Sequence, residues 1–328
     1  MRIHHYGVLT SILAASLLIS GNSLAASAEY PIKGKVITAI VPSSAGGGSD
    51  TIARSVSPLM ERDLGTSIQV VNKPGAGMQI GLTSALASKP DGYTLIWTIL
   101  PTTLGVYLDP DRHATFGRKD IHNIALVTDG PFVLSVLATS PYKTLKDLVD
   151  ATKANPEKIK IATTGYLSTG HLGAVELQRV MGVKMAPVHF EGGGPALIAL
   201  LGGHVDVSLN SLGEIRSQYQ AGAIRVLGIL DKAESRFLPG VKTLESQGYK
   251  VYVSSSVGLS APAGIPKEYV TILASSVKKA MENEDFKKNM ESRGETLRYL
   301  DPAQYAADWE QKEAQYKPLV ELAKKDQK

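Results

Sequence analysis

The chain has 328 residues, no cysteine, and a formal net charge of +4 from 35 Lys and Arg against 31 Asp and Glu. This small positive balance argues against nucleic acid as a partner, because binding to the phosphate backbone needs many clustered basic side chains. The lack of cysteine excludes disulfides and a lipid anchor on an N-terminal cysteine.

The first segment is typical of an export signal. Arg2 precedes an apolar run over residues 6–19, and residues 26–28 offer an A-x-A cleavage site. We therefore predict that residues 1–28 are a cleaved signal peptide and that the mature protein is periplasmic without a lipid anchor. Nothing later in the sequence is apolar enough to cross a bilayer.

The rest of the chain alternates apolar runs with amphipathic segments, which is the pattern of strands joined by helices into parallel sheets. We predict strands at 35–41, 67–71, 94–99, 158–164, 184–190 and 204–210. The intervening helices are expected at 50–65, 81–88, 171–182 and 195–203. About 300 mature residues are more than one hydrophobic core usually supports, so two domains are expected.

Two segments are candidates for crossing between the domains, 124–139 and 250–262. After them we expect only helices, at 266–283, at 284–294 and from Asp301 onward, where Gln304 completes a capping box and Pro318 kinks or splits the last helix. The predicted fold is an α/β, two-lobed fold with two crossing strands as hinge. Its boundaries are 29–130 for the first part of lobe 1, 131–254 for lobe 2 and 255–328 for the second part of lobe 1.

Glycine-rich loops follow several of the predicted strands. "VPSSAGGGSD" at 41–50 stands between a strand and a helix, and "ATTGYLSTGH" at 162–171 and "FEGGGP" at 190–195 repeat this arrangement. Such loops lie where open α/β sheets bind ligands, and a helix N-terminus favours an anion. Each loop alone could be an ordinary tight turn, but together they indicate an anion site in a cleft, with Asp50 in a structural role at its helix start.

Other chemistries have weaker support. "GAGMQIG" departs from the dinucleotide fingerprint, no phosphate loop or G-x-S-x-G elbow is present, and the histidines lack metal-ligand spacing, so no cofactor and no metal are expected. His171 beside Ser168 leaves an exported hydrolase or isomerase of carboxylate esters open. We interpret residues 108–120, with Asp109, Asp111 and Asp120, as a solvated loop.

Several segments together resemble the Bug receptors, the substrate-binding proteins of tripartite tricarboxylate transporters. They are "VITAIVPSSAGGGSDTIAR", "VVNKPGAGMQIG", "KPDGYTL", "KTLKDLVDATKANPEKIKIATTGYLSTGHLGAVEL" and "PALIALLGGHVDV". The resemblance implies a periplasmic binding protein of the Venus flytrap type (type II), without catalysis, which delivers a small organic carboxylate to two membrane permease subunits. We expect a monomer.

The resemblance also implies site residues. The loops that hold one ligand carboxylate in the family correspond here to Ser43, Ser44, Ala45, Gly46 and Gly47 on one side and to Thr164, Ser168, Thr169 and Gly170 on the other. Phe190, Gly192 and Asn210 would line the variable side, and Thr98 and His171 complete the candidate set.

The identity of the ligand stays open between dicarboxylates, tricarboxylates, acidic amino acids and aromatic carboxylates. Glu191 would repel a second carboxylate, attract an amino group, or remain an exposed loop residue without either role. Trp97 is expected to pack between sheet and helix rather than to line the site. A soluble sensor that acts on a signalling partner remains an alternative to a transport receptor.

Overall fold

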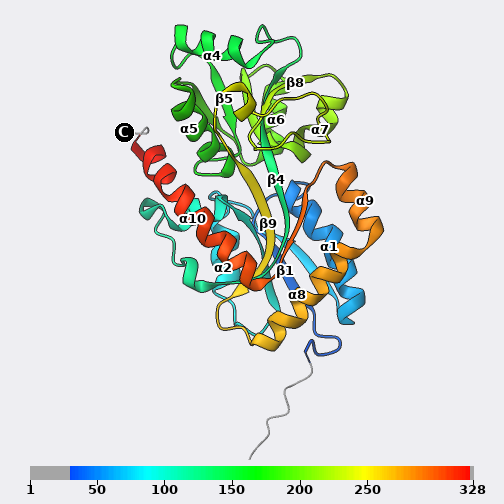
Figure 1. Cartoon of the computed structure of the whole chain (residues 1–328). Helices are drawn as coiled ribbons and strands as arrows, with labels where there is room; N and C mark the ends of the chain where they lie inside the picture. The colour runs from blue at the N-terminus through cyan, green and yellow to red at the C-terminus, as the bar shows by residue number, and fades with distance from the viewer. Residues whose placement is uncertain (1–29, 326–328) are drawn as a thin grey trace, which may run out of the picture.

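The computed structural model describes residues 30–325, so the predicted signal peptide lies outside the described residues. The chain forms two α/β lobes, one above the other in Figure 1. We define lobe 1 by β1–β3, β10, α1–α3 and α8–α10, and lobe 2 by β5–β8 and α4–α7. Strands β4 and β9 run between the lobes (Figure 1).

Lobe 1 begins with a parallel core. Its strands β1 and β2 are parallel, β1 and β3 are parallel, and β9 joins β3 in antiparallel direction. Helix α1 ends where Gly65 adopts a left-handed conformation and its N–H bonds to Glu61 O, a common helix stop. The bounds in this lobe are β1 Ile37–Val41, α1 Gly48–Leu64, β2 Ile68–Asn72, α2 Gln79–Leu86, β3 Thr94–Leu100, α3 Thr102–Tyr107, α8 Lys267–Glu282, α9 Glu284–Ser292, β10 Leu297–Leu300 and α10 Pro302–Lys325.

Lobe 2 repeats this plan. Strands β5 and β6 are parallel, as are β5 and β7, while β7 and β8 each pair with β4 in antiparallel direction. The bounds in this lobe are α4 Leu145–Ala154, β5 Lys160–Thr163, α5 Thr169–Met181, β6 Ala186–His189, α6 Gly193–Leu201, β7 Val207–Ser211, α7 Leu212–Gln220 and β8 Ile224–Ile229.

The long strand β4, Ile121–Leu137, belongs to both lobes. Its first part pairs with β9, Ser254–Pro262, and with β10, and its second part pairs with β7 and β8. The predicted crossing segments therefore contain β4 and β9. The domain boundaries proposed from the sequence stay a prediction, while the crossing of the chain at these two strands is an observed feature of the fold.

Each lobe buries apolar side chains on both faces of its sheet. In lobe 1, α1 and α8 cover one face and α2, α3 and α10 cover the other; in lobe 2, α4 and α5 lie opposite α6 and α7. Trp97 is fully buried in the lobe 1 core, as its predicted packing role requires. This arrangement leaves the ends of the strands, rather than the faces of the sheets, for function.

Several local features differ from the sequence prediction. The sequence predicts a kink or a split at Pro318; helix α10 continues through this residue as one element, so the split is wrong and the kink stays a prediction. The C-terminal part is not only helical, because residues 297–300 form β10 on the edge of β4. Helices α3, α4 and α7 and strand β8 were not among the predicted elements. The Asp301–Gln304 capping box is present, with Gln304 N donating to Asp301 Oδ1 at 2.9 Å.

Candidate functional site

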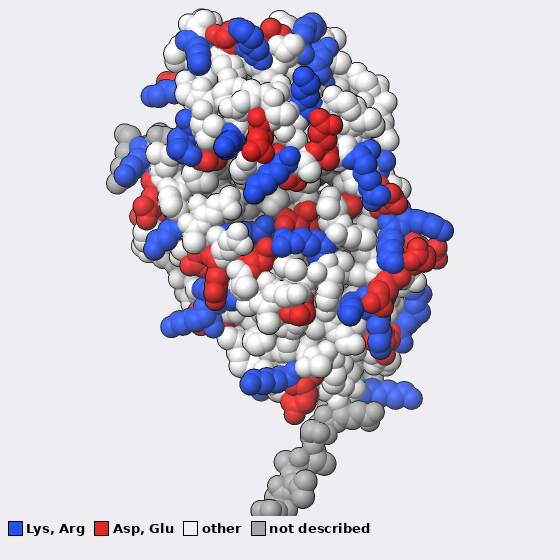
Figure 2. Space-filling view, in the orientation of Figure 1, with Lys and Arg blue, Asp and Glu red and all other residues white. Residues whose placement is uncertain are grey.

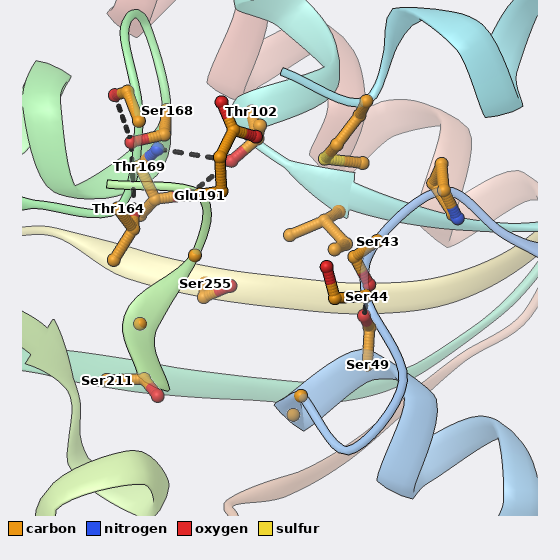
Figure 3. Close-up of a pocket in the computed structure, with 18 of the residues that line it drawn as sticks. Ser43, Ser44, Ser49, Thr102, Thr164, Ser168, Thr169, Glu191, Ser211 and Ser255 are labelled. Carbon is orange, nitrogen blue, oxygen red and sulfur yellow. Dashed lines mark hydrogen bonds between the residues drawn. The ribbon is translucent and has the colours of Figure 1, made fainter. Parts of the chain in front are cut away.

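A cleft of about 900 Å³ lies between the lobes. Its wall includes the loop after β1, the loop after β5 and the starts of α1, α5, α6 and α7. Parallel strands direct these loops to one edge of each sheet, and the two edges face each other across the crossing strands. Figure 3 shows hydroxyl groups of Ser43, Ser44 and Ser49 on one side and those of Thr164, Ser168 and Thr169 on the other.

The lobe 1 wall is formed by the loop before α1. Gly46 there has a φ of +79°, and the N-cap residue Gly47 offers α1 no side-chain cap. The start of α1 therefore presents backbone N–H groups and its partial positive charge toward the cleft.

Asp50 fixes the shape of this loop rather than lining the cleft. Its Oδ2 accepts hydrogen bonds from Gly46 N at 2.8 Å and Arg54 Nε at 3.0 Å, and its Oδ1 accepts from Asn72 Nδ2 at 2.9 Å. Burial acts to raise the pKa of Asp50, but these hydrogen bonds outweigh it and the pKa is lowered. Asp50 is thus an ionised side chain that holds the loop in shape, beside the candidate site for a ligand anion.

The lobe 2 wall is organised differently, because hydroxyl groups already accept from the first N–H groups of α5. Thr169 N donates to Thr102 Oγ1 at 3.1 Å, Gly170 N to Thr164 Oγ1 at 3.3 Å and His171 N to Ser168 Oγ at 3.3 Å. The Ser168 hydroxyl itself donates to Gly165 O at 2.6 Å, while the hydroxyls of Thr102 and Thr169 lie 3.0 Å apart, so one of those two can donate to a ligand. Lobe 2 therefore offers hydroxyl groups to the cleft, polarised by the helix start behind them.

The two lobes touch at one side of the cleft. The Arg112 guanidinium donates to Ala76 O in lobe 1 at 2.8 Å and to Tyr166 O in lobe 2 at 2.9 Å. Gly105 of α3 lies so close to lobe 2 that a Cβ there would stand 2.3 Å from Leu167 O. Burial lowers the pKa of Arg112, although nearby Asp109 opposes that shift. This contact sets how far the lobes approach each other.

Nine predicted site residues lie on the wall of the cleft: Ser43, Ser44, Ala45, Gly46, Gly47, Thr164, Ser168, Thr169 and Gly192. Glu191 lies there as well. Whether the nine bind ligand stays a prediction. Five others, Thr98, Gly170, His171, Phe190 and Asn210, lie off the described wall, and their part in ligand binding stays a prediction too.

The five residues off the wall have structural roles. Thr98 is fully buried and bonds to Tyr305 and Ser260, while Asn210 donates to Gly193 O at 2.9 Å. Phe190 packs against the lobe 2 core. A Cβ on Gly170 would stand 2.9 Å from Thr164 N, so this glycine permits a close backbone approach behind the wall.

His171 is buried, with 4% of its surface exposed, and it is not paired with the Ser168 hydroxyl through its ring. Its Nδ1 accepts from Leu167 N at 3.0 Å, which holds the loop before α5 in place. Burial, with a further contribution from His189, lowers the pKa of His171 to about 3. The neutral ring is thus a support for the loop, and this geometry does not form the serine–histidine pair of a hydrolase.

Sequence reasoning missed several residues of the wall. Residues 74–79 lie in a segment that the sequence analysis compares with a dinucleotide motif and with the Bug receptors but does not assign to the site, and Arg112 lies in the segment interpreted as a solvated loop. In that segment Asp109 is in fact 3% exposed and pairs with Lys324 of α10 at 2.8 Å. Glu214, Ser255 and Glu295 were also missed, and only the crossing of β4 and β9 could have indicated them.

Comparison with known proteins agrees with this architecture. The model of the tripartite tricarboxylate transporter family receptor, TctC, matches residues 52–324. The chain belongs to this receptor family. Members of the family are binding proteins rather than enzymes, and their structures are periplasmic binding proteins of mixed α/β fold.

Individual relatives are similar over nearly the whole chain. A protein encoded in the gbd 5' region of Cupriavidus necator is 29% identical over 93% of each chain. The structure of MatC from Rhodopseudomonas palustris with bound malate is 27% identical, with a TM-score of 0.81 over 89% of this chain and all of that one. The structure of the periplasmic binding protein BugD is 28% identical, with a TM-score of 0.80 over 90% of this chain and 98% of that one.

One face of the molecule shows how the charged side chains are distributed. On the face shown in Figure 2, basic and acidic side chains alternate without a large patch of one sign. Within residues 30–325, no helix combines the length and the apolar composition needed to cross a bilayer.

Proposed function

We propose that the chain is an extracytoplasmic receptor that binds a small organic carboxylate between its lobes and delivers it to the permease of a tripartite tricarboxylate transporter. Family membership supports this role, and a relative at 27% identity has been solved with malate bound. The export signal predicted at 1–28 supports a periplasmic location without a lipid anchor.

The observation that carries the proposal is the uncapped start of α1 opposite the hydroxyl-rich start of α5. A carboxylate between them accepts from backbone N–H groups of lobe 1 and from hydroxyls or bridging waters of lobe 2. Such a ligand stabilises the closed arrangement because its two sets of contacts come from different lobes. The uncapped start of α6, at Gly192, adds a third helix start to the same cleft.

A thermal-shift screen of the mature chain against malate, succinate, citrate, glutamate and benzoate tests the proposal. A ligand at a hundred times its dissociation constant adds roughly 2.7 kcal/mol to stability, which gives a clear rise in melting temperature. A chain that binds none of these acids, after removal of any copurified ligand by refolding, would contradict the proposal.

A matched pair of variants locates the site. A Cβ on Gly48 would have no neighbour within 4 Å, yet Gly48 lines the cleft at the start of α1, so Gly48→Leu should fill ligand space without disturbing the fold. Gly117 has equal room outside the cleft, and Gly117→Leu is the control. We expect binding to be lost only in Gly48→Leu.

A further inference from the structure

Two glutamates, one from each lobe, approach each other on the cleft wall. Glu214 lies in the first turn of α7, and Glu295 lies in the turn between α9 and β10; both line the cleft. A Cβ on Gly213 would stand 2.3 Å from Glu295 Oε1, so the Glu295 carboxyl reaches the backbone directly beside Glu214.

Both glutamates flank the crossing strand β4. Ser211, which caps the helix of Glu214, is the register partner of Phe132. Thr296, which follows Glu295, is the nearest neighbour of a Cβ built on Gly130, at 3.9 Å. The two carboxyls therefore lie near the place where β4 passes from lobe 1 to lobe 2, that of Glu214 against Gly193 and that of Glu295 against Gly213.

In the described part of the chain, neither carboxyl is hydrogen-bonded to a charged donor. Glu214 Oε2 accepts from Ser211 N and Asn210 Nδ2, both at 3.2 Å, and these donors are neutral. Within residues 30–325 neither Glu214 nor Glu295 takes part in an ion pair. Two neighbouring carboxylates in a partly desolvated site are unfavourable unless one of them takes up a proton or a cation joins them.

The titration of the pair follows from this environment. Burial raises the pKa of Glu214. Burial also raises the pKa of Glu295, and the charge of Glu214 raises it further, to about 7. Arg293 opposes this shift without removing it. Near neutral pH, a positively charged group can therefore bind to the pair of glutamates in place of a proton.

The rest of the described wall offers little to a second negative charge. Arg112 is the single basic side chain among the described lining residues; each of its terminal nitrogens donates one hydrogen bond, to Ala76 O and to Tyr166 O, and its Nε lies 3.9 Å from Asp109 Oδ2. Asp109 and Asp111 on the same wall are paired with Lys324. The second carboxylate of a dicarboxylate would therefore lie near the other acidic side chains of the wall, Glu191, Glu214 and Glu295.

We infer that Glu214 and Glu295 form a subsite for a protonated amine, and that the ligand of this receptor is a small amino carboxylate. Its carboxylate lies between the starts of α1 and α5, and its ammonium group bridges the two glutamates. This inference rests on the proposed function, because it assumes that the cleft binds the carboxylate end.

Calorimetric titration at pH 8 with two matched series tests the subsite. One series is 4-aminobutanoate, 5-aminopentanoate and 6-aminohexanoate, with glutamate as an α-amino member; the other is succinate, glutarate and adipate. In the wild-type chain, the best amino carboxylate should bind at least tenfold more tightly than the diacid of equal chain length. Glu295→Gln should reduce that affinity at least tenfold while leaving or improving the affinity for the diacid.

Glu291→Gln is the matched control, because Glu291 is a half-exposed acid on the preceding helix that pairs with Arg236 and lies off the cleft. It should keep the wild-type values. Diacids that bind more tightly than every amino carboxylate, or an equal loss of both series in Glu295→Gln, would overturn the inference and leave the proposed function standing. Failure of both series to bind would overturn the inference and the proposed function together.

Discussion

The buried imidazole of His171 makes the folded chain sensitive to acid. Its Nδ1 must stay unprotonated to accept from Leu167 N, and its pKa is about 3 in the folded state against 6.5 in the unfolded state. The folded chain therefore binds fewer protons than the unfolded chain between these values. The stability that depends on neutral His171 is complete above pH 6.5 and is lost as the pH falls toward 3.

The size of this loss follows from the two pKa values. At pH 5 the linkage relation gives about 2 kcal/mol, and at pH 3.5 about 4 kcal/mol, relative to neutral pH. In His171→Gln the amide cannot be protonated in this range and its oxygen can still accept from Leu167. We expect the drop in free energy of unfolding between pH 7.5 and pH 5 to be about 2 kcal/mol smaller than in the wild type.

Urea unfolding followed by circular dichroism at pH 7.5, 6 and 5 measures this difference directly. His204→Gln is the control, because His204 is exposed and should leave the pH dependence of the wild type unchanged. A drop of the same size in His171→Gln and wild type would refute the argument, since other groups, such as carboxylates, His122 and His189, would then account for the acid sensitivity.

Three further predictions concern lobe contact and export. Gly105→Ala places a methyl group 2.3 Å from Leu167 O, so the lobes must separate by about 1 Å. We expect at least tenfold weaker ligand binding, and a larger radius of gyration of the ligand-bound protein in solution scattering. Unchanged values would contradict the close contact. The lysine in Arg112→Lys cannot reach both Ala76 O and Tyr166 O, so one hydrogen bond from a charged donor is lost, which costs about 1.5–3 kcal/mol. We expect the dissociation constant of the ligand, measured by calorimetry, to rise at least tenfold. An unaltered constant would show that Arg112 does not contribute to closure of the lobes. Intact mass of the periplasmic protein should correspond to a chain that starts at Glu29, and a mass that retains the first 28 residues would show that the predicted signal is not cleaved.

Much of the fold could be predicted from the sequence because its strands are apolar and its helices amphipathic. The strand at 94–99 and the helix at 171–182 are examples in which periodicity and a terminal glycine indicated the element. Strand β10 and the uninterrupted α10 could not be predicted, because tertiary packing outweighed local signals. Tyr316, Leu319 and Val320 are buried on both sides of Pro318, and this packing holds the helix together across the proline.

The candidate site was predictable only where a local motif carried it. The loops at 43–47 and 164–169 were indicated by glycine and hydroxyl residues before helices. Arg112, Glu214 and Glu295 reach the cleft from separate parts of the chain, and only the crossing of β4 and β9 brings them together. His171 was assigned to the ligand because it begins a helix beside Ser168, whereas the helix turns its ring into the protein interior.

The most direct test is a crystal structure of the mature chain with the tightest acid from the binding screens. We predict that a carboxylate of this ligand lies within hydrogen-bonding distance of the backbone at the start of α1 and of hydroxyl groups at the start of α5. A ligand carboxylate bound elsewhere, or in contact with one lobe alone, would contradict the account.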